Sequence, residues 1–343
     1  MLKKILTYPK NHVKIYVSCN TKGAYMSDVV RSGPFSFRVD TDWAKLPDGE
    51  DFNDIADLAV DAQDRVIIFS RSNYPVTVFD KDGKFLSSWK DAAFVRPHGL
   101  TIGDDGMLYC TDDREHTVKK FSPDGKLLLT IGTPGKAPEV GSGEPFNQPT
   151  KVALEPGTGN LFISDGYGND RVHKYTPNGE RLFSWGRSGA QEGEFSIPHS
   201  ICTDRQGFVY VADRENHRVQ VFDGGGRYVS QWNNMFRPCG IYITPDDPQI
   251  AIIGQLPTSL AVNSKFPNLG ACITFHELNG RQIAKIGNPI QGEDLVDQFR
   301  APHAIAMDSR GDIYIGEVAH TFFGSKQNPP VKPRCIRKLI RLS

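Results

Sequence analysis

FVRPHGLTIGDDGMLYCTDDREHTVKKFSPDGKLLLTIG, residues 94–132, is the stretch that decides the fold of this 343-residue chain. Short apolar and β-branched runs, which favour strands, alternate in it with Asp-Gly turns, which supply the positive φ of tight hairpins. The expected strands are Arg96-Pro-His-Gly-Leu-Thr-Ile102, Leu108-Tyr-Cys-Thr-Asp112, Val118-Lys-Lys-Phe121 and Leu127-Leu-Leu-Thr-Ile131. Four antiparallel strands in sequence are the unit of a β-propeller blade.

The same order of strand, turn, strand, loop, strand, turn and strand recurs along the chain. It is readable from Phe52 to Trp89, from Phe146 to Gly186 and from Phe195 to Trp232. A fifth unit starts at Phe236 and is stretched by an insertion, and a sixth unit starts at Phe299. Self-similarity with a period of about 40 to 60 residues is typical of propeller blades.

We therefore predict an all-β fold, a six-bladed β-propeller with four-stranded blades that forms one domain over residues 1–343. The approximate blades are 52–92, 94–134, 146–188, 195–234, 236–290 and 299–343. The sixth unit runs out of chain before its outermost strand. We predict that residues 35–45, with the extended run Phe35-Ser-Phe-Arg-Val39, complete that blade and close the ring, which removes open sheet edges.

Composition narrows the class of partner. The 40 Lys and Arg residues balance the 40 Asp and Glu residues, so no long-range field favours nucleic acid or an anionic membrane. The N-terminal apolar residues are interrupted at Pro9, Lys10 and Asn11, which predicts neither a signal peptide nor a membrane span. Six cysteines are scattered without a C-x-x-C pair. We expect a soluble protein of the reducing cytoplasm that acts on a small molecule, with no nucleic acid or membrane partner.

Three Pro-His pairs occupy matching places at the start of the first strand in every second unit. They are Pro97-His98, Pro198-His199 and Pro302-His303, and Pro149-Thr150 and Pro238-Cys239 fill the same place in two of the units between them. First strands line the channel of a propeller, and alternate blades of six are roughly 120° apart, so the imidazoles should converge. Three imidazoles with an open fourth position are a ligand set of catalytic zinc. We predict that His98, His199 and His303 bind Zn²⁺; capping of a strand start is the plainer alternative for any single pair.

The other histidines lack this equivalence. His116, His173 and His217 come after the second strands of their units, where we expect exposure to solvent. His320 lies in the loop after the second strand of the last unit and could reach the channel mouth, which makes it a candidate substrate-binding residue.

The residues that follow the second strands form one rim of the predicted ring. Arg71, Tyr167 and Arg214 are specific to their units and would project from the same rim as the histidines. A phenol can act as a base once a cation lowers its pKa, and a guanidinium can hold a carboxylate with two hydrogen bonds. Ordinary hydrogen bonding within the rim is the alternative. Recurrent aspartates are expected to cap the rim loops by accepting backbone N–H bonds: Asp112, Asp165 and Asp213.

A set of short runs carries a resemblance to a known family. The runs are Ile68-Phe-Ser-Arg71, Pro97-His-Gly-Leu100, Gln148-Pro-Thr-Lys-Val-Ala-Leu-Glu-Pro156, Phe162-Ile-Ser-Asp-Gly-Tyr167, Phe195-Ser-Ile-Pro-His-Ser200, Val211-Ala-Asp-Arg-Glu-Asn216 and Pro302-His303. They look like NHL repeats, and the fuller pattern resembles the peptidyl-α-hydroxyglycine α-amidating lyase family of six-bladed propellers. The resemblance extends from about Phe52 to Glu317 and is strongest in the middle units.

This resemblance implies roles for named residues. His98, His199 and His303 would bind zinc, Tyr167 would be the catalytic base, and arginines 71 and 214 would flank the substrate. The implied reaction breaks a carbinolamide into an amide and glyoxylate. We expect a small substrate with an anionic or carbonyl group, since the secreted peptides that animal members amidate would not meet a cytoplasmic enzyme.

The chain departs from the family pattern in three places. Ala304 follows the last histidine where the family has an aspartate of a structural calcium site, which makes Ca²⁺ doubtful. Ala301 stands where the family has a methionine, so the substrate pocket should differ there. The cysteine pairs of secreted animal members are missing. Asn147 and Gly168 stand at the positions of one pair, and Tyr210 and Val221 stand at those of the other.

Three functions remain open at this point. The first is a zinc-dependent lyase that acts on a small carbinolamide or related hydroxylated metabolite. The second is a zinc-dependent hydrolase or hydratase in which the same site activates water on a carbonyl substrate, because one metal site can do either. The third is a non-catalytic propeller that binds a protein partner on its rim.

Overall fold

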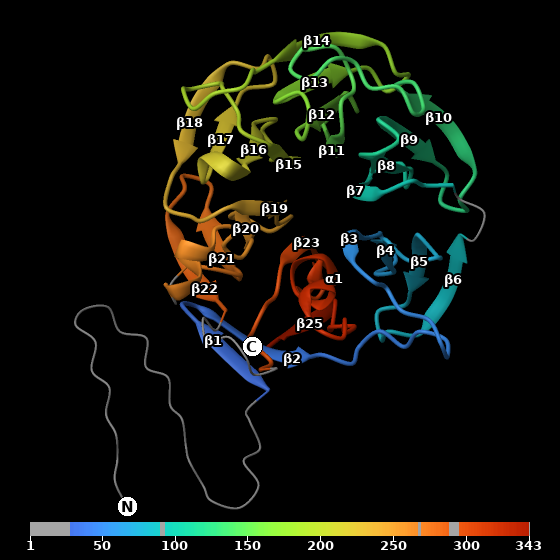
Figure 1. The fold of residues 1–343 in the computed structure, drawn as a ribbon, viewed down its shortest axis with the longest axis vertical. Coiled ribbons are helices and arrows are strands. Elements are labelled where there is room, and N and C mark those ends of the chain that lie inside the picture. The colour runs from blue at the N-terminus through green and yellow to red at the C-terminus, as the bar shows by residue number, and fades with distance from the viewer. Residues whose placement is uncertain (1–27, 90–92, 267–268, 288–294, 343) are drawn as a thin grey trace, which may run out of the picture.

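The computed structural model describes residues 28–89, 93–266, 269–287 and 295–342. Over these residues the chain forms six antiparallel sheets around a common axis, which is a six-bladed β-propeller (Figure 1). The predicted fold class is confirmed. The expectations for the first 27 residues, which include Cys19 and the N-terminal apolar segment, lie outside the described residues.

Each blade runs outward from an innermost first strand (Figure 1). The first three blades are β3–β6 (Ile55–Val60, Val66–Ser70, Val76–Phe79, Phe85–Trp89), β7–β10 (Pro97–Ile102, Leu108–Asp112, Thr117–Phe121, Leu127–Ile131) and β11–β14 (Pro149–Leu154, Leu161–Asp165, Arg171–Tyr175, Arg181–Trp185). The next two are β15–β18 (Pro198–Thr203, Val209–Asp213, Arg218–Phe222, Tyr228–Trp232) and β19–β22 (Pro238–Ile243, Ile250–Gln255, Cys272–Glu277, Gln282–Ile286). The sixth contains β23 (Pro302–Met307), β24 (Ile313–Glu317) and β25 (Ile336–Arg341).

An N-terminal strand completes the sixth blade, as predicted. Strand β2 (Phe35–Asp40) pairs antiparallel with β25, with Phe37 opposite Arg341 and Val39 opposite Leu339. A further strand, β1 (Val29–Ser32), pairs with β2 and makes this sheet five-stranded, which was not predicted. The ring is therefore closed by hydrogen bonds between the two ends of the described chain.

The apolar cores lie between blades rather than within them. One cluster joins Phe69 and Val76 of the first blade to Leu100 and Cys110 of the second, and all four side chains are buried. Trp43 lies in another cluster, where its ring packs 4.9 Å from that of Tyr314 at the seam between the sixth and first blades. Because each fully buried large apolar side chain contributes about 1.5–3 kcal/mol, neighbouring blades stabilise one another and hold the first strands in place.

Few helices interrupt the strands. The short ones are η1 (Arg214–Asn216), η2 (Ala261–Lys265), α1 (Ala319–Phe322) and η3 (Gly324–Lys326), and all follow second strands. Within the described part of the chain, none is long or apolar enough to cross a membrane. The five described cysteines are free thiols. Tyr210 and Val221, which stand at the positions of one family cysteine pair, lie opposite one another on β16 and β17.

Candidate metal centre

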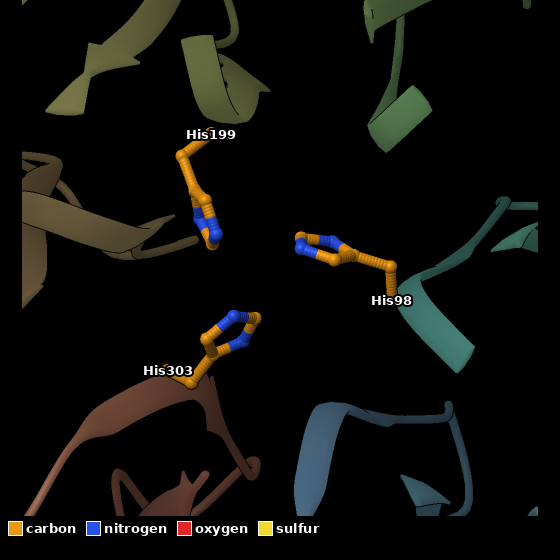
Figure 2. A group of neighbouring side chains, drawn as sticks. All are labelled: His98, His199 and His303. Atoms are coloured by element: carbon orange, nitrogen blue, oxygen red, sulfur yellow. The ribbon is translucent and has the colours of Figure 1, made fainter. Parts of the chain in front are cut away.

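Three imidazoles meet at the axis of the ring. His98, His199 and His303 each come directly after the proline that begins β7, β15 and β23, the first strands of alternate blades. One ring nitrogen from each lies within 4.8 Å of those from the other two, and the residues are only 2%, 2% and 7% exposed (Figure 2). Among the described residues, this is the one group of at least three His, Cys, Asp or Glu that could share a metal ion.

The blades between these three orient the rings. His98 Nδ1 lies 2.7 Å from the carbonyl oxygen of Thr150, and His303 Nδ1 lies 2.5 Å from that of Ala56. His199 Nδ1 is 3.4 Å from the carbonyl oxygen and 3.3 Å from Sγ of Cys239. Thr150, Cys239 and Ala56 belong to the three blades that lack a Pro-His pair. In its own blade, each occupies the place that the histidine occupies in the neighbouring blade. Donation from Nδ1–H to a carbonyl leaves Nε2 as the free lone pair, which is the usual second sphere of a metal-binding histidine.

The close approach of β7 to β11 depends on the glycine that follows His98. A Cβ atom at Gly99 would lie 2.4 Å from the Thr150 carbonyl oxygen and 2.8 Å from the Cα atom of Lys151. Any side chain there would push β7 away from β11. Gly99 therefore brings His98 within reach of the carbonyl that orients it.

The three histidines are held in the neutral form. Burial lowers the pKa of each well below 6.5. The charge of Arg71 lowers it further at His98 and His303, and the charge of Arg214 does so at His199 and His303. Removal from water disfavours the charged imidazolium, and neutral imidazole is the form that binds a metal ion. Three neutral imidazoles in a buried setting match the nitrogen donor set of zinc, so the residues present fit this ion.

Tyr167, in the loop after β12, faces the same point. Its hydroxyl lies 3.0 Å from Nε2 of His98 and 2.9 Å from Nε2 of His199. Nη1 of Arg214 is 3.5 Å from the hydroxyl, and its guanidinium lies 5.4 Å from the centre of the phenol ring. Burial raises the pKa of Tyr167, and the charge of Arg214 opposes that shift. A cation beside the phenol favours the phenolate.

Arg71 and Arg214 hold equivalent places, each directly after the second strand of its blade. The blades are the first and the fourth, which stand across the axis from one another (Figure 1). Arg214 is buried and pairs with Glu215 at 2.7 Å. Arg71 lies 3.5 Å from Asp54 and donates from Nε to the carbonyl of Pro97. Two guanidinium groups thus approach the histidines from opposite sides.

The other two predicted substrate-binding residues lie on the sixth blade. Ala301 is fully buried in a small apolar cluster with Leu256 and Val318. His320 is half-buried on α1 and lines a cavity of about 480 Å³ together with Arg71. The structure therefore places His320 beside a predicted substrate arginine and Ala301 in an apolar wall.

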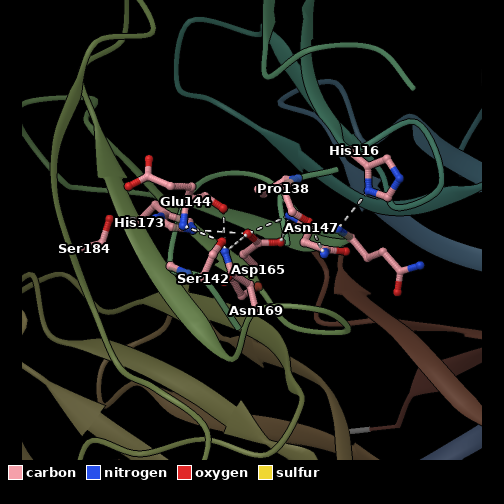
Figure 3. A network of polar contacts seen from close by, with 12 residues as sticks. His116, Pro138, Ser142, Glu144, Asn147, Asp165, Asn169, His173 and Ser184 are labelled. Atoms are coloured by element: carbon pink, nitrogen blue, oxygen red, sulfur yellow. Dashed lines mark hydrogen bonds and ion pairs between the residues drawn. The ribbon is translucent and has the colours of Figure 1, made fainter. Parts of the chain in front are cut away.

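The recurrent aspartates hold the rim loops, as expected. Asp165 accepts the backbone N–H of Asn147 at 2.9 and 3.0 Å and the side-chain amide of Asn169 at 2.8 Å (Figure 3). It also lies 3.2 Å from Nε2 of His173, whose Nδ1 is 2.7 Å from Ser184 Oγ. This network fixes the loop that carries Tyr167. Equivalent aspartates accept backbone N–H bonds in the neighbouring blades: Asp112 and Asp213.

The expected exposure of three histidines was wrong. His173 is fully buried in the network of Figure 3, because its side chain on β13 points inward to Asp165 and Ser184. His116 and His217 are half-buried, and Nδ1 of each accepts a backbone N–H from the following blade. All three serve as structural hydrogen-bonding groups.

Ala304 stands at the position compared with the family's calcium-site aspartate. It lies in an apolar cluster with Ile55 and Leu58 and offers no carboxylate. Another buried carboxylate, Asp57, is paired with Lys151 Nζ at 2.7 Å and accepts N–H bonds from Leu58 and Leu100. That Ca²⁺ is doubtful in this chain stays a prediction.

Asp57→Ala should lower the free energy of unfolding by about 3 kcal/mol, because it leaves the Lys151 ammonium without its partner in the interior. The double variant Asp57→Ala/Lys151→Met should recover part of this loss, since it removes both charges together but still leaves the N–H groups of Leu58 and Leu100 without their acceptor. Denaturant titration followed by circular dichroism would measure both. Equal stabilities of the single and double variants would contradict a buried, coupled pair.

Comparison with known proteins gives relatives of two kinds. An NHL repeat model matches residues 195–222. Human NHL repeat-containing protein 3 is 32% identical over 320 residues, which covers 87% of this chain and 84% of that protein. Peptidyl-alpha-hydroxyglycine alpha-amidating lyase 1 of Drosophila melanogaster is 33% identical over 257 residues, 69% of this chain and 45% of that protein. A streptogramin B lyase structure aligns with a TM-score of 0.57 over 89% of this chain and 98% of that chain, at 14% identity, which shows the fold alone.

Proposed function

Because the chain belongs to the family of NHL-repeat propellers that includes human NHL repeat-containing protein 3, and its relatives include α-hydroxyglycine amidating lyases, we propose that it is a zinc-dependent lyase. Its substrate would be a small α-hydroxylated amide, cleaved at the C–N bond. The observation that carries the proposal is the set of three buried histidines, which lie beside the Tyr167 hydroxyl and between two arginines.

The histidines 98, 199 and 303 would hold the zinc ion through Nε2. When bound there, zinc supplies Lewis acidity that polarises the substrate hydroxyl and a positive charge that favours ionised Tyr167. Thr150, Cys239 and Ala56 keep the imidazoles in the ligating orientation through their carbonyl groups.

The two arginines would bind and orient the substrate. A carbinolamide that yields glyoxylate carries a carboxylate on the hydroxylated carbon, and a guanidinium matches a carboxylate with two parallel N–H bonds. Arg71 and Arg214 approach from opposite blades, so together they fix the hydroxylated carbon next to Tyr167. Fixing the reacting groups in this way removes much of the entropic barrier to reaction.

Tyr167 would move the proton that the reaction requires. The ionised Oη atom accepts the proton of the substrate hydroxyl, the hydroxyl oxygen forms a carbonyl, and the C–N bond breaks with its electron pair on nitrogen. The same proton then passes from Oη to that nitrogen, which gives an amide and glyoxylate with no other reactant. Proton transfer by a positioned side chain contributes about 10²–10⁴-fold to such a rate.

The test is glyoxylate release from α-hydroxyhippurate. We expect benzamide and glyoxylate in equal amounts, loss of turnover after removal of zinc by a chelator, and recovery on addition of Zn²⁺. Arg214→Gln should reduce turnover, whereas the matched control Arg187→Gln, whose side chain is 75% exposed, should not. Bound zinc without glyoxylate release would favour the hydrolase or hydratase. Absence of both bound zinc and turnover would favour the non-catalytic propeller.

A further inference from the structure

One position recurs around the mouth of the ring, directly after the second strand of every blade. Its occupants are Arg71, Asp113, Gly166, Arg214, Leu256 and Val318. The proposed reaction uses the two arginines, and the two aliphatic residues belong to the apolar wall around Ala301. Asp113 is the remaining charged member. It is neither one of the recurrent rim aspartates nor a residue to which the family resemblance gives a role.

Asp113 carries a buried carboxylate with few polar partners among the described residues. It is 0% exposed, and neither carboxylate oxygen has a hydrogen-bond partner among the described residues. Its one ion pair is with Arg96, whose Nη1 lies 3.2 Å from Oδ2. Burial raises the pKa of Asp113 to about 6, and the charges of Arg96 and Arg71 oppose that shift. A carboxylate in such a place is costly unless a cation stays beside it, so Asp113 anchors the guanidinium of Arg96.

Arg96 is thereby directed into a cavity that Arg71 also lines. It comes two residues before His98, and its guanidinium lies 5.9 Å from the centre of the Tyr167 ring. Its side chain is 30% exposed, and it lines the cavity of about 480 Å³ that Arg71 and His320 also line. The donors of Arg96 that do not face Asp113 are therefore available to a ligand.

Two guanidinium groups then share one polar cavity between the first and second blades. The charge of Arg96 is one cause of the lowered pKa of Arg71, after burial, so the two cations repel one another across this space. Asn53, Ser72 and Asn73 add polar side chains to its wall, and so does Asp54, whose carboxylate pairs with Arg71. Arg71 and Arg96 thus have one carboxylate partner each, and their donors that do not face it suit a further carboxylate, because a planar guanidinium binds a carboxylate with two hydrogen bonds.

We propose that Arg96, positioned by Asp113, is a specificity-determining residue that binds a second anionic group, carried by the acyl part of the substrate, in the cavity between the first and second blades. This inference rests on the proposed function for the reaction itself. The substrate class becomes an N-acyl-α-hydroxyglycine whose acyl chain ends in a carboxylate, with Arg71 and Arg214 on the reacting end and Arg96 on the far end.

The experiment compares two substrates of equal size, N-succinyl-α-hydroxyglycine and the neutral-ended N-succinamoyl-α-hydroxyglycine. We expect kcat/KM for glyoxylate release to be about 10- to 100-fold higher for the charged substrate, mostly through KM, since a charge-assisted hydrogen bond contributes on that scale. Arg96→Gln should bring the ratio close to one. Asp113→Asn should lower it in part, and Arg114→Gln, an exposed neighbour that does not line the cavity, should preserve it.

A binding measurement separates this inference from the proposed function. N-succinylglycine and N-succinamoylglycine lack the hydroxyl and cannot react. Both carry the glycine carboxylate, so the difference between their affinities in calorimetric titration of zinc-loaded protein reports the site for the second anionic group. Tighter binding of the charged ligand that disappears in Arg96→Gln would support the site even if no substrate releases glyoxylate. Equal kcat/KM for the two substrates, or a preference that survives Arg96→Gln, would overturn it while leaving the lyase intact.

Discussion

Tyr167→Phe will retain its zinc and lose turnover on α-hydroxyhippurate by a factor of about 10²–10⁴, the usual contribution of a positioned proton-transfer group. The substitution removes only the hydroxyl that lies 3.0 and 2.9 Å from the two imidazole nitrogens. The ring keeps its edge contact with His98, whose centre is 5.3 Å away, so the fold should be unchanged.

Metal analysis and single-turnover glyoxylate release on the same preparation would measure both effects. Tyr175→Phe is a suitable control, because this buried tyrosine of β13 packs in a core between the second and third blades, away from the histidines. A Tyr167→Phe enzyme with more than about a tenth of wild-type turnover would exclude the tyrosine as the base. Loss of zinc in that variant would assign the hydroxyl to metal binding.

His98→Ala and His199→Ala should each reduce bound zinc from about one equivalent to less than about a tenth of one. A tetrahedral site with three protein ligands has none to spare, and even loss of a second-sphere partner lowers affinity about 10–100-fold. Zinc bound to the folded state adds to stability, so a chelator should lower the melting temperature of the wild type but not of either variant.

Elemental analysis of dialysed protein and melting curves with and without the chelator would test this expectation. His217→Gln is the control, because this half-buried histidine bonds a backbone N–H of the next blade instead of facing the axis. A wild type without zinc, or zinc that persists in both alanine variants, would refute the metal centre.

The fold could be predicted from sequence because its determinants are local and repeated. Strand periodicity and turn residues recur along the units, and the missing outer strand of the last unit implied closure by residues 35–45, of which Phe35–Asp40 form the strand. The added strand β1 (Val29–Ser32) escaped prediction because it pairs outside the repeat. Equivalence within the repeat also brought the three histidines into one candidate site before any contact was known.

Other parts of the site depend on contacts that no local pattern encodes. The carbonyl groups that orient the histidines lie 52, 40 and 247 residues away in sequence. His173 was wrongly expected at the surface because its strand position alone does not reveal the inward partner Asp165. Asp113 and Arg96 were missed because neither is part of the family motifs and their pairing across the rim is not visible in the sequence. The available signal was equivalence within the repeat. Asp113 stands where Arg71 stands in the first blade, and Arg96 stands where Ala301 stands in the sixth.

The seam between the first and last blades has a consequence for the newly made chain. β2 and Ala56 precede β25 and His303 in the sequence, so a ribosome makes them first. The bond from His303 to the Ala56 carbonyl spans that seam, so the third imidazole gains its orientation only when the first and sixth blades meet. A chain interrupted before the sixth blade would carry two of the three histidines, and β2 would pair with β1 but lack its partner β25. Completion of the histidine cluster thus requires completion of the ring.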